Sequence, residues 1–230
     1  MTLETEDLRI PFLPAYEVAR KMVNGERVYS TPDGDMFSVT TILSGSEDQT
    51  GLMEWREGIG EKRANEIVEA ACWRGDKQHV NIETWLKTGV EPEFNFIQTP
   101  YWESTRKFLD TVDGSLLIEG AVWHPDGFAG TVDFVGYSTE FGNNPVLFDW
   151  KTADRICKPA KIYKYSLQLA AYRAALNHVY GRTHGLQIDF AQLVVAIPCQ
   201  SPQIEVFDAE ALDQLYRHFL GRKERFLTNR

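Results

Sequence analysis

Two short apolar runs that each carry an aspartate constrain the fold of this chain more than any other feature. The first is the sequence GTVD at 130–133, and the second is LFDWKT at 147–152. Because side chains on a strand alternate between its two faces, Asp149 and Lys151 are expected on the same face. An unpaired charge is costly to bury at the end of the apolar run 146–148. This cost favours a functional site over a fortuitous surface ion pair.

The regions around these runs predict an α/β or α+β fold. Short apolar segments between turn sequences indicate strands, and segments with apolar residues every three or four positions indicate helices. Strands are expected at 116–123, 129–137, 146–150, 187–197 and 203–207, and helices at 51–86, 101–109, 163–180 (ended by Gly181) and after Asp208 as N-cap to about 226. This order of elements predicts a mixed central sheet flanked by helices.

The chain is expected to form a single domain, since 230 residues suit one core. Residues 1–112 are predicted to be a mainly helical N-terminal part, and residues 113–230 the core that contains the sheet. Within the N-terminal part, residues 1–50 look irregular because the segment 29–35 is rich in turn formers. The segment 37–43 is expected to be a short strand or the entry to a helix.

Composition sets limits on the location of the protein. No apolar run approaches the roughly 20 residues that a membrane-spanning helix needs, so no membrane association is expected. The acidic segment 1–7 lacks the basic and apolar regions of a signal peptide. Cys72, Cys157 and Cys199 lie far apart and form no CxxC pair. This spacing argues against a disulfide framework or a zinc site and favours a reducing cytoplasm.

The charge of the chain is unevenly distributed. The net charge of −9 argues against a protein that coats nucleic acid non-specifically. Residues 151–182, however, hold seven Lys or Arg against one acid, a local charge of +6 that leaves −15 for the rest. A polyanion could be drawn to this segment while the remaining surface repels it. The alternative is a solvated helix face.

Asp133 and Asp149 are predicted to bind a divalent metal ion such as Mg²⁺. Hard cations prefer oxygen ligands and often take one or two carboxylates together with water and substrate phosphate. Lys151 would orient an attacking water or stabilise the negative charge that develops on phosphate. Glu119 is either a further catalytic carboxylate or an exposed strand residue, and the sequence leaves both open. His79 could add a nitrogen ligand, although a lone histidine is more often structural.

Residues of the predicted basic helix are candidates for binding DNA. Gln168 and Tyr172 are four positions apart and therefore share a helix face. Gln168 can hydrogen-bond a phosphate or a bound water, and Tyr172 can do the same or stack on a base. The predicted DNA-binding residues are these two together with Lys158, Lys161, Lys164 and Arg173. Tyr101 and Trp102 could also present rings to single-stranded DNA, with core packing as the alternative.

Taken together, four ordered motifs resemble the RecB-like branch of the PD-(D/E)XK nuclease superfamily. They are GxxxH at 75–79, GTVD at 130–133, DWK at 149–151 and QxxxY at 168–172, within a resemblance over about residues 75–200. The segment SVTTIL at 38–43 and the helix around Trp55 resemble the corresponding part of the mitochondrial genome maintenance exonuclease and phage exonuclease type. These two segments extend the resemblance to about residue 36. The resemblance implies a restriction-endonuclease-like core.

The resemblance also implies roles for individual residues. His79, Asp133 and Asp149 match the metal ligands of the family, and the Trp150 carbonyl matches a further ligand. Lys151 matches the catalytic lysine. The pair Gln168 and Tyr172 matches the motif that supports the site and contacts DNA.

The implied function is that of an Mg²⁺- or Mn²⁺-dependent exonuclease that hydrolyses phosphodiester bonds from free, single-stranded DNA ends. The alternatives are a structure-specific endonuclease on the same fold, a DNA-binding subunit of a recombination or repair complex, and a phosphatase.

Three unclustered cysteines make an iron–sulfur cluster unexpected. Val132 stands where the PD motif has proline, as is common in this branch. No P-loop is present, so unwinding would need a helicase or another replication or recombination partner. The expected setting is the cytoplasm of a bacterial or phage-infected cell.

Overall fold

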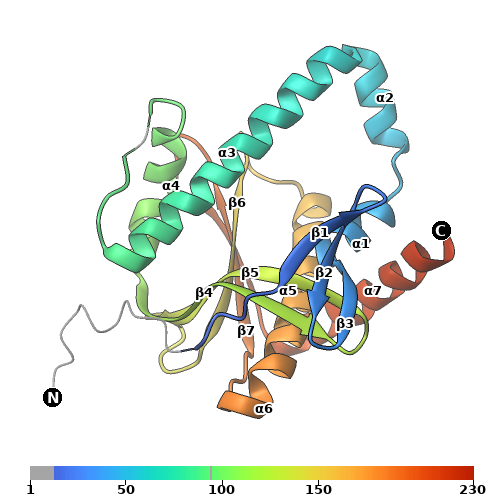
Figure 1. Ribbon diagram of the computed structural model, residues 1–230. Helices are drawn as coiled ribbons and strands as arrows, with labels where there is room; N and C mark the ends of the chain where they lie inside the picture. Colours follow the sequence, from blue (N-terminus) through green and yellow to red (C-terminus); the bar gives the residue numbers. More distant parts are fainter. Residues whose placement is uncertain (1–12, 94) are drawn as a thin grey trace, which may run out of the picture.

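The computed structural model describes residues 13–93 and 95–230, in which a mixed sheet lies between two groups of helices (Figure 1). The acidic segment 1–7 lies outside the described residues. The α+β class and the mixed central sheet predicted from the sequence are confirmed.

The strands form one sheet in the order β1-β2-β3-β5-β6-β7-β8, with β4 paired to β5. Their bounds are β1 (Ala19–Val23), β2 (Glu26–Thr31), β3 (Gly34–Ser38), β4 (Val112–His124), β5 (Phe128–Ser138), β6 (Val146–Thr152), β7 (Phe190–Ala196) and β8 (Gln203–Phe207). Strand β6 runs parallel to β7, and β3 runs parallel to β5 over a short stretch. The remaining pairs are antiparallel.

Helices cover both faces of this sheet. They are α1 (Val39–Gly45), α2 (Thr50–Ile59), α3 (Glu61–Thr88), α4 (Thr99–Leu109), α5 (Pro159–Val179), α6 (Gly181–His184) and α7 (Ala209–Thr228). Helices α3 and α4 share one hydrophobic core with Phe148 of β6, whereas α1, α5 and α7 share the other core with Leu147. Strand β6 is therefore buried on both faces, as its apolar run predicts.

The described residues before position 50 are not irregular as predicted, because β1, β2 and β3 extend the sheet there. The segment 37–43, predicted as a short strand or a helix entry, contains the end of β3 and the start of α1. Strands β1 and β2 are joined by Asn24 (φ 52°) and Gly25 (φ 80°). Two consecutive residues with positive φ are typical of a type I′ hairpin turn, and the dipeptide Asn-Gly is a strong signal for it. Ser38 then caps α1 by accepting a hydrogen bond from the Thr41 amide at 3.0 Å.

Two helix boundaries also differ from the prediction. The single helical segment expected at 51–86 is divided into α2 and α3 at Gly60, whose φ of +83° an L side chain rarely adopts. Helix α5 begins with Pro159 in its first turn, four residues earlier than predicted. Asp208 caps α7 as expected, since its side chain accepts from the Ala211 amide at 2.9 Å.

None of the helices in the described part of the chain is long and apolar enough to cross a membrane.

Candidate active site

Six of the predicted site residues line one cleft of about 570 Å³. Elements on both sides of the sheet contribute to it: α3 supplies His79, β4 supplies Glu119, β5 supplies Asp133, β6 supplies Lys151, and α5 supplies Gln168 and Tyr172. Residues that are up to 93 positions apart in the sequence therefore meet in one place, as the four motifs predict.

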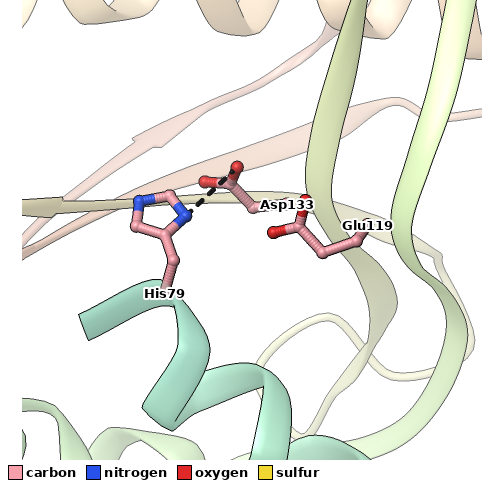
Figure 2. Close-up of side chains that lie close together, drawn as sticks. All are labelled: His79, Glu119 and Asp133. Carbon is pink, nitrogen blue, oxygen red and sulfur yellow. Dashed lines mark ion pairs between the residues drawn. The ribbon is translucent and has the colours of Figure 1, made fainter. Parts of the chain in front are cut away.

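His79, Glu119 and Asp133 form a group that could hold a metal ion. Each offers one ligand atom, and these atoms lie within 4.8 Å of one another. Figure 2 shows the two carboxylates and the imidazole directed toward a common point. The group, called the metal-site triad below, provides two oxygen donors and one nitrogen donor. Carboxylate oxygens are donors for Mg²⁺ and Mn²⁺, and an imidazole nitrogen also binds Zn²⁺ and other transition metals, so the set suits a divalent cation without identifying it.

The two polar contacts of the His79 imidazole support its role as a ligand of this group. Its Nε2 lies 2.8 Å from the Trp150 carbonyl oxygen, which can only accept, so Nε2 carries a proton and donates it. Its Nδ1 lies 3.5 Å from Asp133 Oδ1. A neutral imidazole would thus direct a lone pair toward a carboxylate. A proton on Nδ1, or a cation bound between the two atoms, is needed to make this arrangement favourable.

Glu119 is held in an unusual backbone conformation. Its φ is +53° in the middle of β4, where an L residue is strained by about 1–2 kcal/mol. Such strain is concentrated at functional sites, where the surrounding structure enforces it. Burial, followed by the negative charge of Asp133, raises the pKa of Glu119 to about 7. Of the two possibilities left open by the sequence, the structure places Glu119 in the cleft rather than on an exposed strand face.

Asp149 and Lys151 form a buried ion pair on one face of β6, as the strand periodicity predicts. Their side chains are only 1% and 17% exposed, and the Lys151 ammonium contacts Asp149 Oδ2. Gln168 donates to Asp149 Oδ1 at 3.1 Å. Burial raises the pKa of Asp149, despite the opposing effect of Lys151. Burial lowers the pKa of Lys151, but Asp149 and Asp133 outweigh it and the net shift is upward.

Asp133 connects this ion pair to the metal-site triad. Its Oδ2 accepts a hydrogen bond from the Trp150 amide at 2.9 Å, while its Oδ1 faces His79. Trp150 lies between Asp149 and Lys151 in the sequence, so this hydrogen bond fixes Asp133 beside the ion pair of β6. Asp149, predicted as a second metal ligand, is not part of the triad, and its carboxylate is held by Lys151 and Gln168.

Tyr172 explains the glycine of the GTVD sequence. A Cβ added at Gly130 would lie 2.4 Å from Tyr172 Cε1, so the ring packs directly on the glycine backbone. Tyr172 is 5% exposed, and burial raises the pKa of its phenol well above the usual value. The hydroxyl therefore stays neutral. The packed ring supports the cleft and does not present a face on which a base could stack.

The predicted DNA-binding cations of α5 are placed differently from one another. Lys158 and Lys161 are exposed near the start of the helix, and Lys164 pairs with Glu47. Arg173 is not brought to the cleft. Its side chain is 13% exposed and is held by Asp213, Asp189 and the Ile188 carbonyl, so it stabilises the fold.

The two aromatic residues considered for single-stranded DNA belong to the core. Tyr101 and Trp102 are 7% and 2% exposed. Tyr101 donates to Asp154 at 2.7 Å, and Trp102 donates to Glu91 at 2.7 Å. Core packing, the alternative that the sequence offered, is what the structure shows.

Sequence reasoning missed the contribution of the N-terminal strands to the cleft. Arg20, Arg27 and Tyr29 line it from β1 and β2. The Asn24-Gly25 dipeptide between two alternating segments was the signal that could have identified this hairpin.

Comparison with known proteins does not identify a family. No protein-family model matches the sequence, and no curated protein matches it. The crystal structure of SSO0001 aligns with 78% of this chain and 74% of that chain, with 11% sequence identity and a TM-score of 0.36.

Proposed function

We propose that this protein is a metal-dependent nuclease that hydrolyses phosphodiester bonds from free, single-stranded DNA ends. The observation that carries the proposal is the position of Asp133. One of its carboxylate oxygens faces His79 of the metal-site triad, and the other accepts from the Trp150 amide between Asp149 and Lys151. A candidate cation site and a buried ammonium group thus lie in one cleft, an arrangement that suits the hydrolysis of a phosphodiester.

His79, Glu119 and Asp133 would hold the cation. When bound, Mg²⁺ or Mn²⁺ supplies a water of lowered pKa and shields the charge on the phosphate. Its positive charge would also offset the repulsion between the Glu119 and Asp133 carboxylates.

Lys151 acts as a fixed positive charge. Because the nearby carboxylates raise its pKa, it is protonated in neutral solution and cannot serve as the base. It can stabilise the additional negative charge on the phosphate in the transition state. Gln168 keeps the Asp149 carboxylate oriented toward this lysine.

The biological setting belongs to the same proposal. The three cysteines are free, which fits a reducing cytoplasm of a bacterial or phage-infected cell. A helicase, or another partner in replication or recombination, would supply single-stranded ends.

The proposal is tested by incubating three substrates with Mg²⁺, Mn²⁺ or EDTA. They are end-labelled linear single-stranded DNA, end-labelled linear duplex DNA, and closed circular DNA. We expect metal-dependent loss of the linear single strand, with closed circles intact. Cleavage of circles would identify an endonuclease instead. Binding without cleavage of any DNA would favour a DNA-binding subunit, and hydrolysis of small phosphate monoesters alone would favour a phosphatase.

The Lys151→Ala variant provides the mechanistic control. It should bind DNA but lose cleavage, whereas Lys21→Ala, which removes an exposed lysine paired with Asp35, should behave as the wild type. Since removal of Lys151 leaves the buried Asp149 unpaired, the melting temperature of the variant must be measured beside its activity. Full activity in a folded Lys151→Ala protein would contradict the mechanism.

A further inference from the structure

The β1–β2 hairpin places two arginines over the catalytic cleft. In its register Arg20 lies opposite Tyr29 and Met22 lies opposite Arg27, so these four side chains share one face. The Tyr29 hydroxyl lies 3.2 Å from Thr131 Oγ1, which fixes this face on β5 two residues before Asp133. Both arginines line the cleft.

These arginines are not paired with the acids of the same cleft. The cleft also contains Asp76, Glu83 and the two carboxylates of the metal-site triad. Among residues 13–93 and 95–230, however, neither Arg20 nor Arg27 forms an ion pair with any of them. The cleft thus has an acidic side suited to a cation and an arginine side suited to an anion.

A second groove continues from the cleft past Arg27. It has a volume of about 440 Å³, within the range of ligand pockets, and shares Arg27, Thr40 and Gln168 with the cleft. Lys164 and Tyr165 also line it. This space, called the outer groove below, is lined by residues of the β1–β2 hairpin, α1 and α5.

The lining of the outer groove matches the parts of a nucleotide. Lys164 already pairs with Glu47, whereas Arg27, at the junction of the two spaces, forms no ion pair within residues 13–93 and 95–230. Tyr165 offers a partly exposed ring, with the ammonium groups of Lys151 and Lys161 at 5.4 and 5.6 Å from its centroid. Met22 and Leu43 add apolar surface. A cation and an aromatic ring in the same groove suit the phosphate and the base of one nucleotide.

We infer that the outer groove is a second subsite, which binds the nucleotide next to the scissile bond through contact of Arg27 with the adjoining phosphate. This inference rests on the proposed function and specifies its substrate as a strand with at least one further nucleotide beyond the scissile phosphate. Arg27 is a binding residue, and the chemical step remains with the triad and Lys151.

The first test compares Arg27→Ala and Arg27→Gln with Lys21→Ala. Lys21 lies on the opposite face of the same hairpin, paired with Asp35, so its removal makes the same charge change away from the groove. Binding of a fluorescein-labelled ten-residue thymidine oligonucleotide is followed by anisotropy in Ca²⁺ at several salt concentrations. We expect affinity to fall at least fivefold in both Arg27 variants and the slope of log K against log salt to flatten by about 0.7. Lys21→Ala should change neither.

The second test compares two substrates in Mn²⁺. Bis(p-nitrophenyl) phosphate is a phosphodiester without a neighbouring nucleotide, so it cannot use the outer groove. The Arg27 variants should lose at least tenfold more kcat/KM on the oligonucleotide than on this small ester. An equal loss on both substrates, or an unchanged salt slope, would overturn the inference.

The two tests separate this inference from the proposed function. If the wild type binds the oligonucleotide with an Arg27-dependent slope but hydrolyses neither substrate, the proposed function fails while the subsite stands. If the wild type hydrolyses DNA but the Arg27 variants match Lys21→Ala, the subsite fails while the nuclease assignment stands. An oligonucleotide that does not bind to the wild type refutes the subsite.

Discussion

The Nε2 atom of His79 lies 2.8 Å from the Trp150 carbonyl oxygen, a contact that joins α3 to β6 across the cleft. The carbonyl accepts the imidazole proton and so makes Nδ1 the atom that faces the carboxylates. Outer hydrogen bonds of this kind commonly orient histidines that bind metals. The family resemblance predicts the Trp150 carbonyl as a metal ligand, whereas its partner in the structure is the imidazole.

Removal of His79 should weaken metal binding. A metal at 100 times its dissociation constant stabilises the folded state by about 2.7 kcal/mol, which a thermal melt with and without Mn²⁺ would detect. We expect His79→Ala to bind Mn²⁺ at least tenfold more weakly by calorimetric titration and to lose most of this stabilisation. His218→Ala, a change at an exposed histidine on α7, should keep both. Equal Mn²⁺ affinity in His79→Ala would exclude the imidazole as a ligand.

Neutralisation of Glu119 should separate stability from metal binding. Its carboxylate is partly buried beside Asp133, and this environment raises its pKa to about 7. In EDTA at pH 8, Glu119→Gln should therefore be more stable than the wild type by roughly 1–2 kcal/mol, since the cost of burying the charge and the repulsion from Asp133 are both removed but the side chain is partly solvated. Denaturant unfolding measures this difference. The same variant should lose the response to Mn²⁺; a lower stability in EDTA would show that the carboxylate is not repelled.

Gly130→Ala should disturb the site through Tyr172. The new Cβ would lie 2.4 Å from the Tyr172 ring, so the ring or the strand has to move, at about 1–3 kcal/mol of stability. Gln168, one turn away on α5, should shift with it, and DNA cleavage should fall. Gly221→Ala is the matched control, because a Cβ there meets nothing within 4 Å. A fully stable and active Gly130→Ala protein would rule out the close packing.

His124 should contribute to the loss of stability in mild acid. Burial lowers its pKa from the ordinary 6.5; Asp126 opposes this shift, and His178 and Lys223 reinforce it, while the Tyr216 ring also packs against His124. The unfolded chain therefore binds a proton before the folded chain does. The contribution of the neutral His124 imidazole to the free energy of unfolding is complete above pH 6.5 and is lost as the pH falls through the lower folded-state pKa.

The pH dependence can be measured with His124→Asn. Between pH 7 and pH 5 the wild type should lose stability with a slope from this group of at most about 1.4 kcal/mol per pH unit. The variant should show a flatter dependence in denaturant unfolding. Identical slopes would mean that the protonated imidazole is accommodated in the folded state.

Local sequence pattern was sufficient for the core of the fold. Turn sequences and apolar runs predicted β4 to β8, and the bounds of β8 agree with the prediction. The period of two along β6 predicted that Asp149 and Lys151 share a face, which their ion pair confirms. These features depend on neighbouring residues only, so they can be read from the chain.

The N-terminal strands were missed for a different reason. Each is short, and the residues of β1 are all exposed, so the segment lacks the apolar run that marks a strand. Strand β1 is kept in the sheet by its hydrogen bonds to β2, which pairs in turn with β3, and β3 pairs with β5.

The sequence by itself determined which residue types were available for a metal and a phosphate and on which strand face they would lie. The tertiary structure decided which of them meet. It brought Glu119 into the metal-site triad through a strained backbone, and it assigned Arg173 to Asp213 of α7 instead of to DNA. Both outcomes depend on charges that are distant in sequence, and the energy of a charged side chain is set by its neighbours in space and by its burial.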